Sequence, residues 1–177
     1  MQVWKTNSTV GCHFHFFLDL DTGNPFVLHF LLIEHPKFVI FFFRFNCVAT
    51  AKLLIERGAN PSLVSTNGST ALHFAAHRGN DQVAELLVHH AKIDVDSKDS
   101  AYMTPLHLAC VSGNAAISRM LLGQGADIRA KSTELMTPLH TAVYNGNSDV
   151  AAMILRAGGW PVQKAILADS SVIVDLN

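Results

Sequence analysis

The stretch Thr104-Pro105-Leu106-His107 decides the fold of this chain, because it recurs at a nearly fixed interval. Thr70-Ala71-Leu72-His73 stands 34 residues upstream, and Thr137-Pro138-Leu139-His140 stands 33 residues downstream. In each copy a Gly-Asn pair begins nine residues after the Thr. Sequence periods of about 20 to 50 residues are typical of proteins built from stacked structural repeats. The sequence therefore predicts an array of such units.

Each residue of the recurring stretch suits the start of a helix. The Thr hydroxyl can accept hydrogen bonds from backbone N–H groups of the first turn, and Pro fits the first helical position, where its missing N–H is not needed. Leu begins an apolar face. The small pair that follows, such as Ala75-Ala76 or Ala109-Cys110, allows a neighbouring helix to pack closely. The Gly-Asn pair tolerates left-handed backbone and is expected to end the helix.

A second helix is predicted in each copy, because apolar residues recur there at spacings of three and four on one face. Gly125 and Gly158 are expected to close this second helix, as Gly58 does for a half repeat beginning at Val48. The corresponding apolar positions are Val83, Ile117 and Val150; Leu86, Met120 and Met153; Leu87, Leu121 and Ile154; and Val88, Leu122 and Leu155.

Polar stretches such as Asp94–Asp99 and Ala126–Lys131 separate the helix pairs and are predicted to be extended hairpin loops. The whole unit resembles the ankyrin repeat, which consists of a β-turn loop and two antiparallel helices and begins its first helix with T-P-L-H. The resemblance covers roughly residues 48–159. It implies an all-α fold, an ankyrin-repeat solenoid of antiparallel helix pairs with β-turn loops. We expect about three and a half repeats, with seven helices between residues 48 and 157.

Composition favours one domain in an intracellular setting. The chain has 177 residues and a net charge of −1, which argues against a nucleic-acid-binding arm or a polybasic membrane patch. Cys12, Cys47 and Cys110 form neither a disulfide framework nor a zinc-site spacing. Cys110 takes the place of Ala76 and Val143 in the other copies, so we expect a buried core residue. A reducing compartment, the cytoplasm, fits this use of cysteine.

Residues 1–46 do not follow the repeat and are predicted to be an irregular, Phe-rich segment. Its apolar runs Phe26–Ile33 and Phe38–Phe43 are far shorter than the roughly 20 residues of a spanning helix. We expect this segment to fold against the first repeat; an interfacial or hairpin membrane element is the alternative. Phe-rich runs are also what pyrimidine-rich non-coding sequence yields when translated. We therefore hypothesise an alternative start joined to a repeat at its second helix.

The repeat ends near Gly159. Residues 47–159 are predicted to form the ankyrin-repeat domain, and residues 160–177 a divergent tail or partial cap. A further T-P-L-H would begin near residue 170, where Ser170-Ser171-Val172-Ile173 stands instead. Because arrays of this kind normally need a polar cap at each end, we expect the chain to be a fragment of a longer array.

No catalytic constellation is present in the sequence. The phosphate-binding, dinucleotide-binding, nucleophile-elbow and zinc-protease motifs are all absent. We expect no enzyme activity, no cofactor, no metal site and no small-molecule substrate. The group Cys12-His13-Phe14-His15 lacks partner ligands at a usable spacing. The resemblance implies structural roles for the motif residues Thr70, His73, Thr104, His107, Thr137 and His140, with each ring hydrogen bonding between loop and helix.

Function is therefore expected to come from a surface. The resemblance implies that a protein partner contacts the loop tips and the first-helix residues that face the same way. Arg and Tyr are favoured at binding hot spots, so Arg78 and Tyr144 rank first. The positions that correspond are His77, Arg78, Val111, Ser112, Tyr144 and Asn145 on the helices, and Ser65, Thr66, Asp99, Ser100, Thr133 and Glu134 on the loops.

Three functions fit these features. The first is a cytoplasmic protein-interaction module, a scaffold or adaptor, without catalytic activity and without a nucleic-acid partner. The second is a fragment of the cytosolic ankyrin region of a membrane ion channel, because Met103–His107 and Met136–His140 are similar to repeats of the ankyrin-class transient receptor potential channels. Membrane association is expected only in that case. The third is a targeting subunit of a larger enzyme complex.

Overall fold

The computed structural model describes residues 48–89 and 93–158. The irregular segment 1–46 and the tail 160–177 lie outside these residues. So do the interpretations made of them: the alternative start, the packing of the Phe-rich runs, the Cys12 group and the partial cap. The domain limits near residues 46 and 159 therefore stay predictions.

Within the described residues the chain forms seven α-helices and no β-strand, apart from an isolated bridge between Val64 and Thr70. This confirms the predicted all-α fold. The helices are α3 (Val48–Glu56), α4 (Ala71–Arg78), α5 (Asp81–Val88), α6 (Pro105–Ser112), α7 (Ala115–Gly123), α8 (Pro138–Tyr144) and α9 (Ser148–Ala157).

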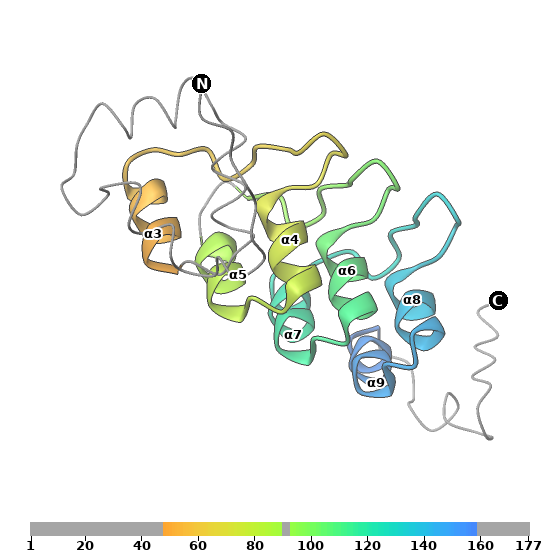
Figure 1. The fold of residues 1–177 in the computed structure, drawn as a ribbon. Coiled ribbons are helices and arrows are strands. Elements are labelled where there is room, and N and C mark those ends of the chain that lie inside the picture. The colour runs from red at the N-terminus through yellow and green to blue at the C-terminus, as the bar shows by residue number, and fades with distance from the viewer. Residues whose placement is uncertain (1–47, 90–92, 159–177) are drawn as a thin grey trace, which may run out of the picture.

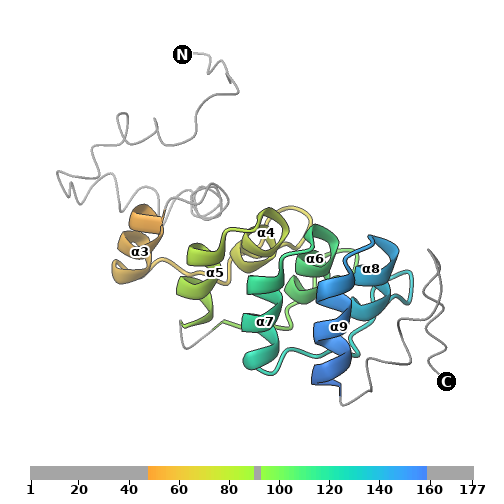
Figure 2. The same ribbon diagram turned by 90° about the horizontal axis from the view of Figure 1, so that it is seen from below.

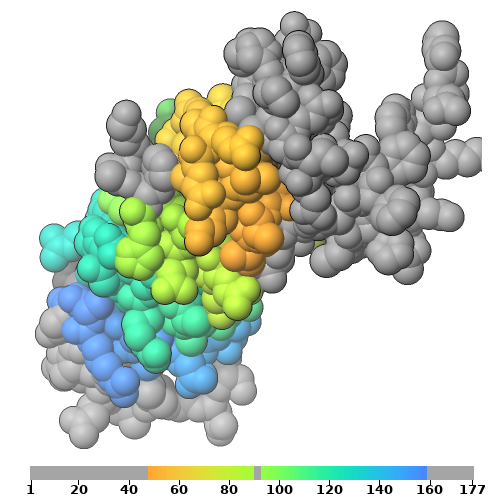
Figure 3. Space-filling model, turned by 90° about the vertical axis from the view of Figure 1, so that its left-hand side faces the viewer, coloured from red at the N-terminus to blue at the C-terminus, as the bar shows by residue number. Residues whose placement is uncertain are grey.

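The helices form two layers. Figure 2 shows α4, α6 and α8 in one row and α3, α5, α7 and α9 in the other, so each repeat contributes one helix to each layer. The loops before α4, α6 and α8 project from the same side of the stack and lie next to one another (Figure 1). Seen from the α3 side, α3, α5, α7 and α9 follow one another along the molecule in chain order (Figure 3). This arrangement is the predicted solenoid.

The predicted helix starts are confirmed. Thr70, Thr104 and Thr137 are N-caps with extended backbone, and Pro105 and Pro138 occupy the first helical position. The hydroxyls of Thr70 and Thr137 accept from the backbone N–H of His73 and His140 at 3.4 Å. All three hydroxyls also lie close to Nδ1 of the histidine ring three residues later, at 2.8, 2.9 and 2.7 Å.

The helix ends agree with the sequence in part. Gly79 and Gly113 cap α4 and α6 with left-handed backbone, at φ of 72° and 69°. Gly58 and Gly125 are also left-handed after α3 and α7. Gly158 differs, since it caps α9 at φ −77° in the right-handed region. Any residue adopts that conformation, so the backbone at this position does not require glycine.

The core lies between the two layers. Leu72, Leu106 and Leu139 are almost completely buried, as the motif predicts. The small residues that follow these leucines in the chain, among them Ala76 and Cys110, are fully buried in the layer formed by α4, α6 and α8. Burial raises the pKa of the Cys110 thiol to about 12. This side chain is therefore a neutral part of the packing at physiological pH. None of the described helices has the length and apolar character needed to cross a membrane.

Candidate partner-binding surface

Histidine side chains join the starts of α4 and α6 to the loop of the following repeat. The backbone N–H of Thr70 donates to His73 Nδ1 at 3.1 Å, and His73 Nε2 lies 3.0 Å from the carbonyl oxygen of Met103. His107 repeats the arrangement with Thr104 and with the Met136 carbonyl oxygen, at 3.1 and 3.0 Å. Because Nδ1 accepts a hydrogen bond, the ring proton must sit on Nε2 and point at the carbonyl. The structural role expected for these two rings is thus present in the geometry.

The two linking rings are buried and neutral. Desolvation lowers the pKa of His73 below its ordinary value, although the Met103 carbonyl and the carboxylate of Asp99 act in the opposite direction. Desolvation likewise lowers the pKa of His107, against the Met136 carbonyl and Asp99. Burial opposes the charged imidazolium because water no longer solvates it. These histidines therefore serve as hydrogen-bonding links, not as cationic contact groups.

The loop tips are tied into a row by backbone hydrogen bonds. The N–H of Ser100 donates to the carbonyl oxygen of Asn67, and the N–H of Thr133 donates to that of Ala101, both at 2.9 Å. Within the second loop, Asp99 Oδ1 accepts from the N–H groups of Ala101 and Met103, both at 2.9 Å. The tips are therefore pre-ordered, which lowers the entropy that a partner must overcome on binding.

The hydrogen bonds also define which loop residues correspond. Ser65, Asp99 and Ser132 each open a turn that closes four residues later, at Ser69, Met103 and Met136. The predicted pair Thr133-Glu134 is thus one residue out of register with the pairs Ser65-Thr66 and Asp99-Ser100. The reason is the period, which changes from 34 to 33 residues between the copies. Thr133 and Glu134 are nevertheless exposed at the third tip.

The predicted contact residues on the first-layer helices differ in how available they are. His77, Arg78 and Asn145 are exposed, and Tyr144 is 83% exposed. Val111 is half-buried. The Ser112 hydroxyl donates to the carbonyl oxygen of Ala76 in the neighbouring repeat at 3.0 Å. Ser112 therefore helps to hold two repeats together, and Tyr144 is the most exposed apolar side chain of the set.

Two exposed apolar residues at the tips were missed by the sequence analysis. Tyr102 and Leu135 are 56% and 71% exposed, and both have left-handed backbone, at φ of 57° and 61°. They occupy the turn position that Gly68 fills in the first loop, at φ 73°. Left-handed backbone costs a side chain with a Cβ about 1–2 kcal/mol. The sequence alone could have revealed these two residues, because an alignment of the three turns places Tyr102 and Leu135 at the position of Gly68.

No group of histidine, cysteine or acidic residues among the described positions is arranged to hold a metal ion. The free cysteine of this region, Cys110, is buried, and the two linking histidines are engaged by backbone groups. The surface itself carries aromatic, aliphatic and hydrogen-bonding side chains, among them Tyr102, Leu135 and Ser100.

Comparison with known proteins agrees with this architecture. The family pattern described as "Ankyrin repeats (3 copies)" matches residues 38–132 and 102–164. The chain belongs to the ankyrin-repeat family. Members of this family are generally interaction modules, and nothing in the match indicates catalysis.

Individual relatives match over less than half of this chain. Delta-latroinsectotoxin-Lt1a of Latrodectus tredecimguttatus is 36% identical over 86 residues, which are 48% of this chain and 7% of the toxin. The human transient receptor potential cation channel subfamily A member 1 is 35% identical over 81 residues, 46% of this chain and 7% of the channel. This confirms the predicted similarity to that channel class. Human protein phosphatase 1 regulatory subunit 27 is 38% identical over 76 residues, 43% of this chain and 49% of the subunit.

Proposed function

We propose that the repeats form a protein-interaction module without catalytic activity. Its partner is a protein that contacts the loop tips and the accessible residues of α4, α6 and α8. The exposed apolar side chains Tyr102, Leu135 and Tyr144 carry this proposal. Large apolar side chains that are exposed are available to a partner, and aromatic residues are enriched among binding hot spots.

Backbone conformation supports the same assignment. Tyr102 and Leu135 hold left-handed backbone although they remain largely exposed, so burial does not offset the cost of that conformation. Residues kept in unfavourable conformations cluster at functional sites. The hydrogen bonds between Ser100 and Asn67 and between Thr133 and Ala101 then present the tips in a fixed order.

The remaining predicted contacts belong to this proposal. On the helices, the exposed residues lie at corresponding positions near the ends of α4 and α8: His77, Arg78, Tyr144 and Asn145. At the loop tips, the exposed residues are Thr66, Ser100, Thr133 and Glu134. Ser65, Asp99 and Val111 are half-buried, and the Ser112 hydroxyl donates to the carbonyl oxygen of Ala76 in the neighbouring repeat. We assign the first group to partner contact and the second to support of the surface.

Selection from a random peptide library displayed on phage, with the purified full chain immobilised, tests the proposal. We expect selected peptides to lose about tenfold in affinity with Tyr102→Ala, Leu135→Ala or Tyr144→Ala, the effect of removing one moderate hot spot. Arg119→Ala and Gln124→Ala, at exposed positions of α7 and its C-cap in the other layer, are matched controls that should leave affinity unchanged. Peptides that respond to the α7 variants alone would contradict the assigned surface.

Two wider settings are proposed as alternatives, each favoured by one relative. The match to the transient receptor potential channel favours a cytosolic fragment of a channel. The match to protein phosphatase 1 regulatory subunit 27 favours a targeting subunit of a larger enzyme complex. In both settings the module lies in the cytoplasm. The full open reading frame separates them, since six apolar stretches of about 20 residues would indicate the channel.

A further inference from the structure

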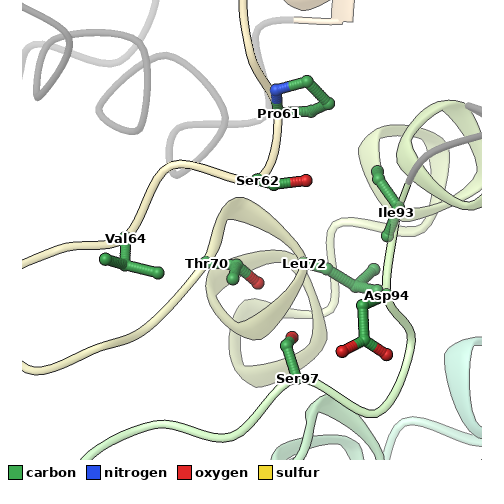
Figure 4. A pocket seen from close by; sticks show the side chains of 8 residues that line it. All are labelled: Pro61, Ser62, Val64, Thr70, Leu72, Ile93, Asp94 and Ser97. Carbon is green, nitrogen blue, oxygen red and sulfur yellow. The ribbon is translucent and has the colours of Figure 1, made fainter.

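A pocket of 230 Å³ lies between the first two hairpin loops and the start of α4. Figure 4 shows Pro61, Ser62 and Val64 on the first loop, and Ile93, Asp94 and Ser97 on the second. Pro61, Val64, Leu72 and Ile93 supply the apolar part of its wall. The partner-binding surface proposed above uses none of these residues.

Ser97 gives the pocket an unsatisfied polar group. Its hydroxyl oxygen is buried and, among the described atoms, has no hydrogen-bond partner. The repeat does not call for a serine at this position, since the turn alignment places Leu63 and Ala130 there in the flanking loops. A buried hydroxyl without a partner is costly, and such a group calls for an explanation.

Asp94 gives the pocket its charge. It is the one charged side chain among the described residues that line the pocket. Its Oδ1 accepts from the Asp96 N–H at 2.9 Å, which closes the loop. Asp127 makes the same bond with the Arg129 N–H at 2.8 Å in the next loop. Both loops therefore contain this hydrogen bond, but only Asp94 also lines the pocket.

We propose that this pocket receives a lysine side chain of the protein partner. The four methylene groups of lysine suit the apolar wall, and its ammonium group is a compact charge with three donors that suits Asp94 and the Ser97 hydroxyl. This assignment rests on the proposed function, because the lysine belongs to the partner.

Other side chains fit less well. An arginine binds a carboxylate best through two parallel hydrogen bonds, and here Asp94 Oδ1 already accepts a bond from its own loop. A carboxylate would meet Asp94 as a like charge. A purely aliphatic side chain would leave the Ser97 hydroxyl unsatisfied.

Titration of the 15N-labelled full chain with n-butylammonium, a mimic of the lysine side chain, tests the pocket. We expect saturable amide shifts at Ile93–Ser97, with a dissociation constant on the order of 1–10 mM, as is typical of so small a ligand. The ring of His73 provides a second reporter, because Thr70 lines the pocket and its hydroxyl lies 2.8 Å from His73 Nδ1. Neutral n-butanol and anionic butyrate should bind at least about tenfold more weakly.

Matched variants separate charge from loop structure. Asp94→Asn should weaken n-butylammonium binding about tenfold, whereas Asp127→Asn, which alters the same loop bond one repeat away, should leave it unchanged. Ser97→Ala copies the residue found at position 130 and should lower the affinity about threefold while the fold is retained. Equal binding of n-butanol, an unchanged affinity in Asp94→Asn, or no saturable shift would each overturn the proposal.

The two proposals fail in different experiments. If n-butylammonium binds as expected but no displayed peptide depends on Tyr102, Leu135 or Tyr144, the pocket stands and the partner-binding surface does not. If peptide binding depends on those residues but n-butylammonium does not bind to the pocket, the partner-binding surface is supported and the lysine site is contradicted. Selected peptides whose binding falls when their lysine is replaced by norleucine, in parallel with Asp94→Asn, would support both.

Discussion

At the start of the first helix of each repeat, Leu72, Leu106 and Leu139 hold one buried position. At the tip of each loop, one position is instead held by Gly68, Tyr102 and Leu135, of which the last two are largely exposed. The first position is constrained by packing, because any other side chain would leave a cavity or a clash. The second is constrained mainly by the backbone, and its side chains Tyr102 and Leu135 are available to the partner that we propose. Stability and the proposed recognition thus involve different positions of one repeat framework.

Shortening a core leucine should have the largest effect. Leu106 is fully buried between repeats on both sides, so Leu106→Ala should reduce the free energy of unfolding by about 2–5 kcal/mol. Urea denaturation followed by circular dichroism measures this change. A loss smaller than that of a tip variant would show that the buried position is not the one that sets stability.

Removing a helix cap should cost less. Thr104→Ala deletes the hydroxyl that lies 2.9 Å from His107 Nδ1 and should lower the free energy of unfolding by about 0.5–2 kcal/mol. Urea denaturation of both variants shows whether Leu106→Ala or Thr104→Ala causes the larger loss in the free energy of unfolding. If Thr104→Ala were more damaging than Leu106→Ala, the cap and not the core would dominate the helix start.

Substitution by glycine usually lowers the free energy of unfolding, but at the tip position it should raise it. Tyr102→Gly should raise the free energy of unfolding by up to about 1 kcal/mol, because glycine adopts left-handed backbone at little cost. Gly68→Ala should lower it by about 1–2 kcal/mol, since a Cβ there would also lie only 3.2 Å from the Ser100 nitrogen. Thermal melts of the two variants test this pair. A destabilised Tyr102→Gly would mean that Tyr102 contributes to folding, against its proposed role in binding.

Acid should weaken the links between repeats. The pKa values of His73 and His107 are lowered in the folded protein, so the unfolded chain binds more protons as the pH falls below about 6.5. Stability should be complete above that pH and decline from there toward the lowered folded pKa values. Urea melts at pH 7.5 and 5.5 measure the decline, which His107→Asn should reduce.

Local signals in one repeat were enough to predict the helix starts at Pro105 and Pro138, the buried leucines and the buried Cys110. Each of these features depends on residues within one or two helical turns, where capping and hydrophobic spacing operate. The predicted contact set stays a prediction. It included Ser112, whose hydroxyl bonds to Ala76 of another repeat, and it lacked Tyr102 and Leu135.

By itself, then, the sequence determined the repeat, its helices and its core, because the spacing of Thr, Leu, Ala and Gly along the chain encodes each of them. Only the tertiary structure decided which side chains are exposed at the loop tips and which are bonded to a neighbouring repeat. The bond from Thr133 to Ala101, the link from His73 to Met103 and the pocket between Val64 and Ser97 all join residues about 30 positions apart. Such contacts depend on how one repeat sits on the next. No window of sequence the length of a helix contains that information.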